Sequence, residues 1–544
     1  MARKTRTDPY AKVAAAPASG ATHDKQAQKV LALFQRAKQL RSSFEGSFQE
    51  CYDYALPTKR SLFSSSVGEN RTVKIFDETA VVGVQEFASR IQSGLMPPFT
   101  RWAKLEAGAD VPDDEKDEVT GSLEAATNYL FDILQDSNFT DETGEALLDL
   151  AVGTGFLEIE EGDAVNPIVS KAIPIASMWI DTGPDDRIDS FFRVHHMRLS
   201  HVRLKWPKAV IPATLVQAYT KALDGIEDPP CVIVEAIRRD YSQPNEERWT
   251  REIVHETDQS ILFFEQMHGE GSCPIIGFRW SKMAGEAWGR GPLMLAMPAI
   301  KTLNFVIELT LENAEMAIAG LYTVEDDGVV NVDTVSLVPG TLIPVAPGSA
   351  GLKAVGPAGN FDVAQLVLSD MRANVKRALF NDSLDTPGKT PRSATEVAER
   401  QADLSRAMGS NFARLMYEFV DPAIKRHVYL LEKKKLLELP KAGGKVVRIR
   451  STSPLSRAQK MQDVSNFGQY AQMVGQLFGP QQVNLAIDAT SASDWLAEQM
   501  DVPKKLNRPK PEQQQLVAAL EQQSAMPEPQ GGPPSQALGP PAGP

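Results

Sequence analysis

The chain has 544 residues, of which 70 are acidic and 57 are basic, so its formal net charge is −13. A protein that grips duplex DNA by neutralising phosphates needs a basic surface, and this charge balance argues against that class. It does not exclude a protein past which DNA slides. Hydrophobic residues make up 42% of the chain, which is enough for a sizeable core. At about 150 residues per domain we expect three or four folding units.

The cysteines and the terminal composition indicate the compartment. Cys51, Cys231 and Cys273 are far apart and odd in number, which fits neither a zinc site nor a disulfide framework and favours a reducing compartment. The basic N-terminus is not followed by an apolar segment, so we expect no secretory signal. No run of about 18 consecutive apolar residues occurs, so we also expect no membrane span.

The N-terminal half begins with helices and continues with strands. Residues 1–24 are rich in Ala, Pro and Thr and are expected to form a disordered arm. Asp24 is the expected cap of a helix that runs to about Ala55 and is stopped by Pro57. Further helices are expected over 77–95 and 114–135, and short apolar runs between 155 and 280 predict strands joined by turns.

The C-terminal half alternates helix and strand in a different order. Apolar periodicity predicts helices over 292–319 and 362–380, with a strand-like segment between them. A polar loop over 381–393 leads to a long helix from about Ala394 to Leu437, which Pro422 should kink. Helices are again expected over 455–500, whereas residues 506–544 are rich in Gln and Pro and cannot build a core. The predicted class is α+β, without βαβ alternation.

Motifs that would indicate an enzyme are missing from this sequence. Gly443-Gly444-Lys445 lacks the first glycine and the hydroxyl residue of a phosphate-binding loop. Gly153-Thr-Gly155 and Gly289-Arg-Gly291 each lack the third glycine of a dinucleotide site, so a turn or close backbone packing explains them better. We therefore predict that the protein is not an enzyme and uses no cofactor.

Polar pairs also have simpler explanations than catalysis. His195 and His196 are neighbours in a predicted strand, so their side chains should point to opposite faces and cannot easily chelate one metal ion. Solvated turns or helix N-termini explain the acidic pairs better than acid–base chemistry. These pairs are Asp113-Asp114, Asp185-Asp186 and Asp326-Asp327.

Five blocks, in order along the chain, carry the most distinctive motifs of the sequence. The most specific block spans Arg279 to Asn304 and contains Gly-Glu-Ala-Trp-Gly-Arg-Gly-Pro. Another, from Ile75 to Leu105, has an Asp-x-Thr that opens a helix and a Leu-x-Pro-Pro that closes it. The remaining blocks are Ser137 to Glu160, Arg392 to Leu404 and Ser453 to Lys460. Together the blocks extend over about residues 25–505, and in this order they resemble the portal proteins of short-tailed bacteriophages.

The resemblance implies a portal fold, which is a ring of subunits, usually twelve, around a central DNA channel. Each subunit would have a wing, a helical stem, a β-rich clip and a helical crown. The implied division is: wing, 25–291; stem helices, 292–319 and 362–380; clip, 320–361; tunnel loop, 381–393; long kinked helix and return to the wing, 394–454; wing and crown helices, 455–505; disordered tail, 506–544.

Charged residues in the implied stem and loop are the candidate channel residues. Glu308, Glu312 and Glu315 follow Asn304 at helical spacing and share one face. This face is either an ordinary solvated surface or a channel wall or subunit interface, where negative charge would keep DNA from sticking. Arg372 and Lys376, with the neighbouring Arg377, are candidates for pairing with the Glu face of the next subunit.

In the implied tunnel loop, Lys389 and Arg392 are the candidate cations that face DNA. Pro387-Gly388 and Pro391 disfavour both helix and central strand, so the loop is expected to project. A plain surface loop is the simpler alternative.

The resemblance also implies partners and a place in the cell. The portal would carry double-stranded DNA, without sequence preference, during packaging and ejection. It would contact terminase, the major capsid protein, the scaffold, a tail adaptor and internal core or ejection proteins. It would lie at one vertex of the virion, and in the host cytoplasm during assembly, with no membrane partner. Alternatives are the packaging ATPase, which needs the missing phosphate loop, or another virion protein such as a scaffold or tail adaptor.

Overall fold

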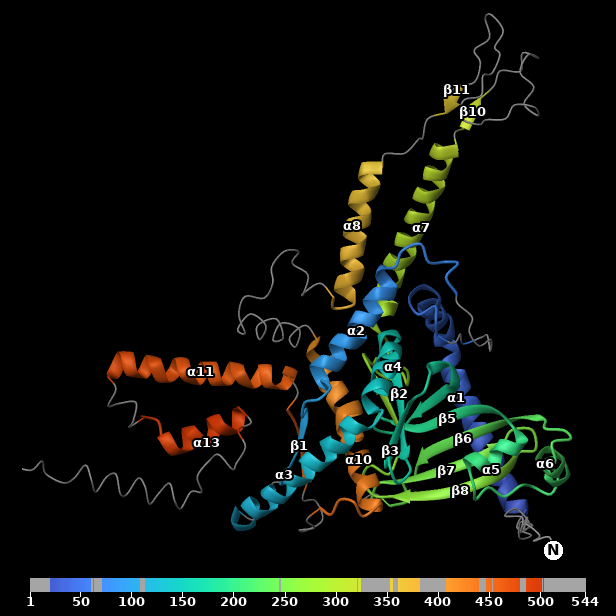
Figure 1. Ribbon diagram of the computed structural model, residues 1–544, viewed down its shortest axis with the longest axis horizontal. Coiled ribbons are helices and arrows are strands. Elements are labelled where there is room, and N and C mark those ends of the chain that lie inside the picture. The colour runs from blue at the N-terminus through green and yellow to red at the C-terminus, as the bar shows by residue number, and fades with distance from the viewer. Residues whose placement is uncertain are drawn as a thin grey trace, which may run out of the picture. The chain divides into compact units, whose positions relative to one another are not determined.

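The computed structural model describes residues 20–59, 62, 71–107, 113–243, 246–319, 321–323, 353–355, 361–381, 408–439, 447–452, 454–479, 486–500 and 502. The chain divides into two compact units, Met1–Gln459 and Lys460–Pro544. In the first unit, helices surround two antiparallel sheets (Figure 1). The mixture of helix and sheet confirms the α+β class.

Helix α1 (Gly20–Ala55) lies along the larger sheet. Its first half buries Val30 and Phe34 against Phe192 and Val234 of the sheet, and its second half joins the main core of the unit. The expected start was wrong, because the helix begins four residues before Asp24. Apolar contact with the sheet begins at Ala27, and it stabilises the body of this helix.

Three helices follow α1. The first two agree with the predicted ranges 77–95 and 114–135 to within two residues, and a third comes after them. They are α2 (Thr79–Leu95), α3 (Asp113–Asp136) and α4 (Phe139–Val152). Asp113-Asp114 opens α3, so this acidic pair lies at a helix N-terminus, where the helix dipole favours negative charge.

The strands form two main sheets that both belong to the first unit. The smaller sheet has the order β3-β2-β9 and the larger one the order β4-β5-β6-β7-β8. Their strands are β2 (Thr154–Glu161), β3 (Ile168–Ala172), β9 (Ile275–Arg279), β4 (Met178–Thr182), β5 (Ile188–Arg198), β6 (Pro230–Arg239), β7 (Arg248–His255) and β8 (Ser260–His268). Every pairing in these two sheets is antiparallel, and their strands lie between Thr154 and Arg279, close to the predicted range 155–280. The β3–β4 connection contains a 3-10 turn (Ile175–Ser177), and the β5–β6 connection contains another (Leu199–His201) and the short helices α5 (Val202–Lys205) and α6 (Val216–Leu223).

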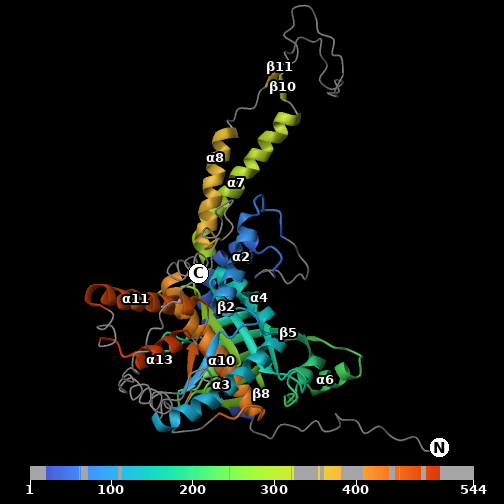
Figure 2. The ribbon, with the colours of Figure 1, turned by 60° about the vertical axis from the view of Figure 1, so that its left-hand side comes forward.

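Two long helices extend side by side from this unit (Figures 1 and 2). They are α7 (Pro292–Ala319) and α8 (Phe361–Ala378), and β10 (Leu321–Thr323) pairs with β11 (Lys353–Val355) at their far end. The predicted bounds are confirmed for α7 and lie within two residues for α8. Over Pro292–Glu315, α7 has a mean hydropathy of 1.4 and 33% of it is buried. It is thus long and apolar enough to cross a membrane, a property that the search for uninterrupted apolar runs did not detect.

The expected long helix is described only from Met408 onward. A π-helical turn, η3 (Met416–Val420), precedes α10 (Asp421–Lys433). Pro422 lies at the start of α10, where its missing N–H costs little because the wider turn before it already interrupts the regular hydrogen-bond ladder. The predicted interruption at Pro422 is therefore a local π-helical turn. The first part of the expected helix, 394–407, lies outside the described residues.

Two further pieces complete the described chain. Strand β1 (Ala103–Ala107) pairs with β12 (Val447–Ser451) and so joins distant parts of the first unit. The second unit contains most of α11 (Pro454–Phe478), together with α13 (Ala489–Gln499). Their contact includes the rings of Phe467 and Trp495, whose centroids are 5.3 Å apart.

A buried histidine makes the stability of the first unit sensitive to acid. His427 on α10 packs edge-on against the ring of Phe139, with centroids 4.9 Å apart, and its Nδ1 lies 2.7 Å from the Ala423 carbonyl oxygen. Burial lowers the pKa of His427 to about 4. Below its ordinary pKa of about 6.5 the unfolded chain takes up a proton that the folded chain refuses. Stability should therefore fall as the pH drops from about 6.5 to about 4.

We predict that His427→Leu flattens this pH dependence. The native protein should lose up to about 3 kcal/mol of stability through this group between the two pH values, and the variant should lack that loss. Urea unfolding followed by tryptophan fluorescence at pH 7, 5.5 and 4.5 measures the difference. His196→Leu, at an exposed position, is the control and should keep the native slope. An unchanged slope in His427→Leu would contradict the prediction.

Candidate functional site

The base of α7 is held by direct backbone contact between the two glycine pairs noted in the sequence. Gly291 N–H donates to the Val152 carbonyl at 3.0 Å, and Gly289 N–H donates to Thr154 Oγ1 at 3.0 Å. A Cβ atom at Gly289 would clash with the carbonyl oxygen of Gly153, and one at Gly291 with that of Ala151. Close packing, as predicted, is thus the role of both glycine pairs.

Two large buried side chains reinforce the same place. The indole of Trp288 lies between the rings of Phe48 and Phe156, at centroid distances of 5.4 and 5.9 Å. The guanidinium of Arg279, 1% exposed, donates from Nη2 to Glu418 Oε1 at 2.6 Å and from Nε to Oε2 at 3.2 Å. Because Glu418 belongs to η3, the end of β9, the π-helical turn and the base of α7 form one rigid joint.

The predicted acidic row on α7 is only partly a free surface. Glu308 is half-buried and Glu312 and Glu315 are exposed, and none of the three forms an ion pair with another described residue. Asn304 differs, because it is 3% exposed. Its Oδ1 accepts hydrogen bonds from the backbone N–H groups of Phe76 at 2.7 Å and Asp77 at 3.0 Å. Including Asn304 in the open face was therefore wrong, since it joins α7 to the segment before α2.

Arg372 on α8 has a partner within its own subunit. Its Nε and Nη2 donate to Asp77 Oδ2 at 2.9 and 2.8 Å, and Asp77 is 5% exposed. Asp77 Oδ1 accepts from the N–H of Thr79 at 2.9 Å. Asp77 thus links the start of α2 to α8, while Lys376 is exposed. Pairing of Arg372 or Lys376 with a neighbouring subunit stays a prediction.

The candidate loop cations cannot be placed. Lys389 and Arg392 lie outside the described residues, as do the expected tunnel loop from residue 382 onward and most of the expected clip. Their assignment to a DNA-facing loop therefore stays a prediction.

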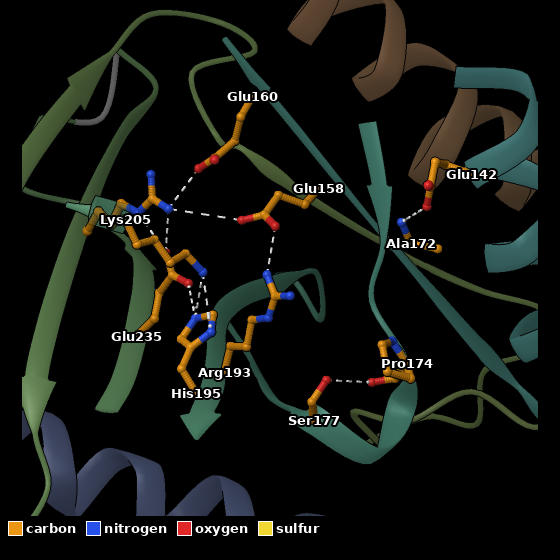
Figure 3. A network of polar contacts seen from close by, with 11 residues as sticks. Glu142, Glu158, Glu160, Ala172, Pro174, Ser177, Arg193, His195, Lys205 and Glu235 are labelled. Carbon is orange, nitrogen blue, oxygen red and sulfur yellow. Dashed lines mark hydrogen bonds and ion pairs between the residues drawn. The ribbon is translucent and has the colours of Figure 1, made fainter. Parts of the chain in front are cut away.

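A second polar cluster ties the two sheets together (Figure 3). Arg193 on β5 binds Glu158 on β2 at 2.6 Å. Arg251 on β7 binds Glu160 on β2 at 2.7 Å and Glu235 on β6 at 2.6 Å. Each sheet contributes a carboxylate to Arg251, so the cation bridges the sheets.

Glu235 and His195 show how the charges in this cluster are balanced. Burial alone would raise the pKa of Glu235, but Arg251 and the hydrogen bond from His195 hold it well below its usual range. Burial lowers the pKa of His195, so the neutral ring donates from Nε2 to Glu235 at 2.7 Å and accepts at Nδ1 from Lys205 at 3.2 Å. His196, in contrast, is exposed. The predicted opposite orientation of the two histidines is confirmed, and this cluster is a structural joint.

Sequence reasoning missed the pairing of Asp77 with Arg372 and of Glu418 with Arg279. Asp77 had a local signal, because the Asp-x-Thr pattern predicts the start of a helix. Its second partner lies 295 residues away, and no spacing rule connects them. The same holds for Glu418, which is 139 residues from Arg279.

We predict that Gly289→Ala strongly destabilises the first unit. Its Cβ would meet the Gly153 carbonyl and the Arg279 side chain, so backbone must shift, at a cost of about 1–3 kcal/mol or more. Gly46→Ala, in the middle of α1 with nothing near the added atom, is the matched control and should stabilise by about 0.5–1 kcal/mol. Thermal unfolding of both variants tests this. Equal melting temperatures would show that the contact is loose.

Comparison with known proteins places the chain in a family. The model of the family described as bacteriophage head to tail connecting protein matches residues 27–507. The portal protein of Salmonella phage epsilon15 is 23% identical over 502 residues, which cover 88% of this chain and 89% of that protein. The probable portal protein of Bordetella phage BPP-1 is 22% identical over 492 residues, covering 86% of each.

Among solved structures, a chain in the virion of a native gene transfer agent particle has a TM-score of 0.35 at 10% identity, covering 72% of this chain and 86% of that one. A chain in the neck of an empty gene transfer agent particle has a TM-score of 0.34 at 11% identity, covering 74% and 90%. The family match extends over most of the sequence. The chain therefore belongs to the family of bacteriophage head-to-tail connecting proteins, which are structural proteins and not enzymes.

Proposed function

We propose that this chain is the subunit of a portal ring, through which genomic DNA enters the phage head and later leaves it. The observation that carries the proposal is the family match over 27–507. It is supported by the two helices α7 and α8, which extend side by side from a rigid base (Figures 1 and 2).

The proposed division of the subunit follows the chain order. The wing comprises 25–291, the stem comprises α7 and α8, and the clip comprises 320–361. The tunnel loop comprises 381–393, from which 394–454 returns to the wing, and 455–505 forms wing and crown helices. The joint at Gly289, Arg279 and Glu418 would then hold the stem rigidly on the wing.

The acidic row gives the proposed channel its character. Glu308, Glu312 and Glu315 project from α7 without pairing to another described residue, and the whole chain carries a net charge of −13. A negative wall repels phosphates, so DNA passes without being held. Exposed pairs with Lys376 of the next subunit would each contribute about 0–1 kcal/mol, repeated around the ring.

A neighbouring subunit is a better cover for α7 than a membrane. Leu295, Phe305, Leu309 and Leu311 are exposed by between 44% and 82%, which is unfavourable in water. Glu308 and Glu312 lie on the same helix, and a charged residue at the centre of a bilayer costs about 2.5–3.5 kcal/mol. Subunit contacts cover apolar residues and leave the carboxylates in water.

The proposed partners are those of a portal at one vertex of the virion. They comprise eleven further copies in a ring of twelve, double-stranded DNA without sequence preference, terminase, the major capsid protein, the scaffold, a tail adaptor and internal core or ejection proteins. Assembly would take place in the host cytoplasm. No membrane partner and no cofactor is proposed.

Ring formation is the first test of this proposal. We predict that purified protein forms closed rings without nucleic acid, because subunit contact is what covers α7. Mass photometry and negative-stain electron microscopy should show one large closed species with a central hole. Truncation after Asn507 should leave it unchanged, since the Gln- and Pro-rich tail cannot bury surface. A monomer of 59.5 kDa at every concentration and salt would overturn the proposal.

The second prediction concerns Lys389 and Arg392. If these cations contact DNA weakly in the channel, replacing both with Ala should leave ring formation unchanged. The free energy of unfolding should change by at most about 0.5 kcal/mol per surface site. Packaging of DNA, or its retention in the head, should be impaired. Packaging assays with assembled heads measure this effect. The matched control replaces Lys25 and Lys29, both exposed on α1. Loss of rings would make the loop residues structural, and normal packaging and retention would make them idle.

A further inference from the structure

Phe99 presents an aromatic ring to solvent on a rigid turn. It is 82% exposed and its φ is +62°, a conformation that is costly for a bulky side chain. Pro97 and Pro98 precede it, and their fixed φ angles hold the turn in one shape. An exposed ring on a strained, rigid turn is unfavourable for an isolated subunit, which points to a partner that repays the cost.

A hollow of matching size lies elsewhere in the same unit. A cavity of about 200 Å³ opens between β5, β9 and η3, with Phe191, Trp249 and Ile276 among its apolar walls. An apolar cavity of about 150 Å³ holds a benzene molecule, so this one has room for a phenyl ring. Arg187 and Tyr417 also line the cavity, and the guanidinium of Arg187 lies 4.6 Å from the centroid of the Tyr417 ring.

One cation lies beside the ring, and one carboxylate, Asp421, lies on a cavity wall that also carries Arg187, Arg239 and Lys425. Arg101 follows Phe99 by two residues, is exposed, and has no side-chain partner among the described residues. Asp421, on the cavity wall, is half-buried, and its carboxylate has no hydrogen bond or ion pair within the described part of the chain. Burial raises the pKa of Asp421, and the charge of Lys425 opposes this only in part, so a second cation would stabilise the carboxylate further.

We propose that Phe99 of one subunit inserts into this cavity of a neighbouring copy, with Arg101 pairing to Asp421. The inference rests on the proposed ring. The donor and acceptor patches lie on different elements, the turn between α2 and β1 and the cavity beside η3. Such a contact is head-to-tail and can repeat around a closed ring. An aromatic anchor in a pocket, flanked by a charge pair, is the usual arrangement of an interface hot spot.

The first experiment measures assembly against concentration. Phe99→Ala should raise the subunit concentration needed for rings by about tenfold to a hundredfold, the loss expected when a buried Phe side chain is removed. Phe264→Ala, which removes an equally large ring that is 42% exposed on β8, is the matched control and should assemble normally. The melting temperature of dilute, monomeric Phe99→Ala should equal that of the native monomer.

A charge exchange tests the second half of the contact. Arg101→Glu and Asp421→Lys should each weaken assembly severalfold, and the double variant should recover most of the loss, because the pair is restored with reversed sign. A merely structural role for either residue would give additive losses.

Crosslinking identifies the neighbours directly. In a Cys273→Ser background, in which Cys51 and Cys231 are buried, subunits with Phe99→Cys are mixed with subunits with Tyr417→Cys. A short bis-maleimide should give covalent dimers, whereas Val82→Cys, exposed on α2, mixed with Tyr417→Cys should give none. If the native protein forms rings, Phe99→Ala assembles as well as the native protein and no crosslink forms, this inference is overturned and the proposed function still stands. Absence of rings from the native protein would overturn the proposed function itself.

Discussion

The backbone contact between Gly289, Gly291 and the turn at Gly153 fixes the point at which α7 begins, beside the smaller sheet. Its geometry leaves no room for a side chain, so the two segments are held at the minimum distance that main chains allow. A helix of 28 residues extends for about 42 Å, and a tilt of a few degrees at its base would move its far end by several ångströms. Arg279 binds Glu418 at the same point, which couples the base to η3. The direction of α7 is thus fixed by close packing and by one buried ion pair.

The joint between the two sheets relies on a different interaction. Arg251 donates to carboxylates from both sheets, and Glu235 is fully buried. Hydrogen-bonded ion pairs are directional, so the cluster holds the two sheets in one orientation at this point. Removing one partner would leave a buried charge uncompensated, which is far more costly than the pair itself is stabilising. Neutral His195 completes the cluster without adding a charge.

Local signals predicted the helices well and long-range contacts poorly. The bounds of α7 were predicted because Gly291-Pro292 marks its start and its apolar periodicity continues to Ala319. The role of the glycine pairs as packing residues was predicted, but not that they pack on each other. Asn304 was misassigned because spacing alone places it with the glutamates, while its backbone partners lie 227 and 228 residues away. Asp24 was misassigned as a cap, because α1 already begins at Gly20.

The composition of α7 follows from two demands that conflict for an isolated helix. At 3.6 residues per turn, Glu308, Glu312 and Glu315 fall within an arc of about 60°. Phe305 and Leu309 lie on one flank of this arc, and Leu311 lies on the other; all three are more than 40% exposed. In water such a helix exposes apolar surface, and in a membrane it buries carboxylates, so neither solvent suits both kinds of side chain. In the proposed ring the flanks contact the neighbours on either side, and the acidic arc is left to face an aqueous channel. A helix that is apolar on average and acidic along one stripe is therefore consistent with the wall of a closed, water-filled ring.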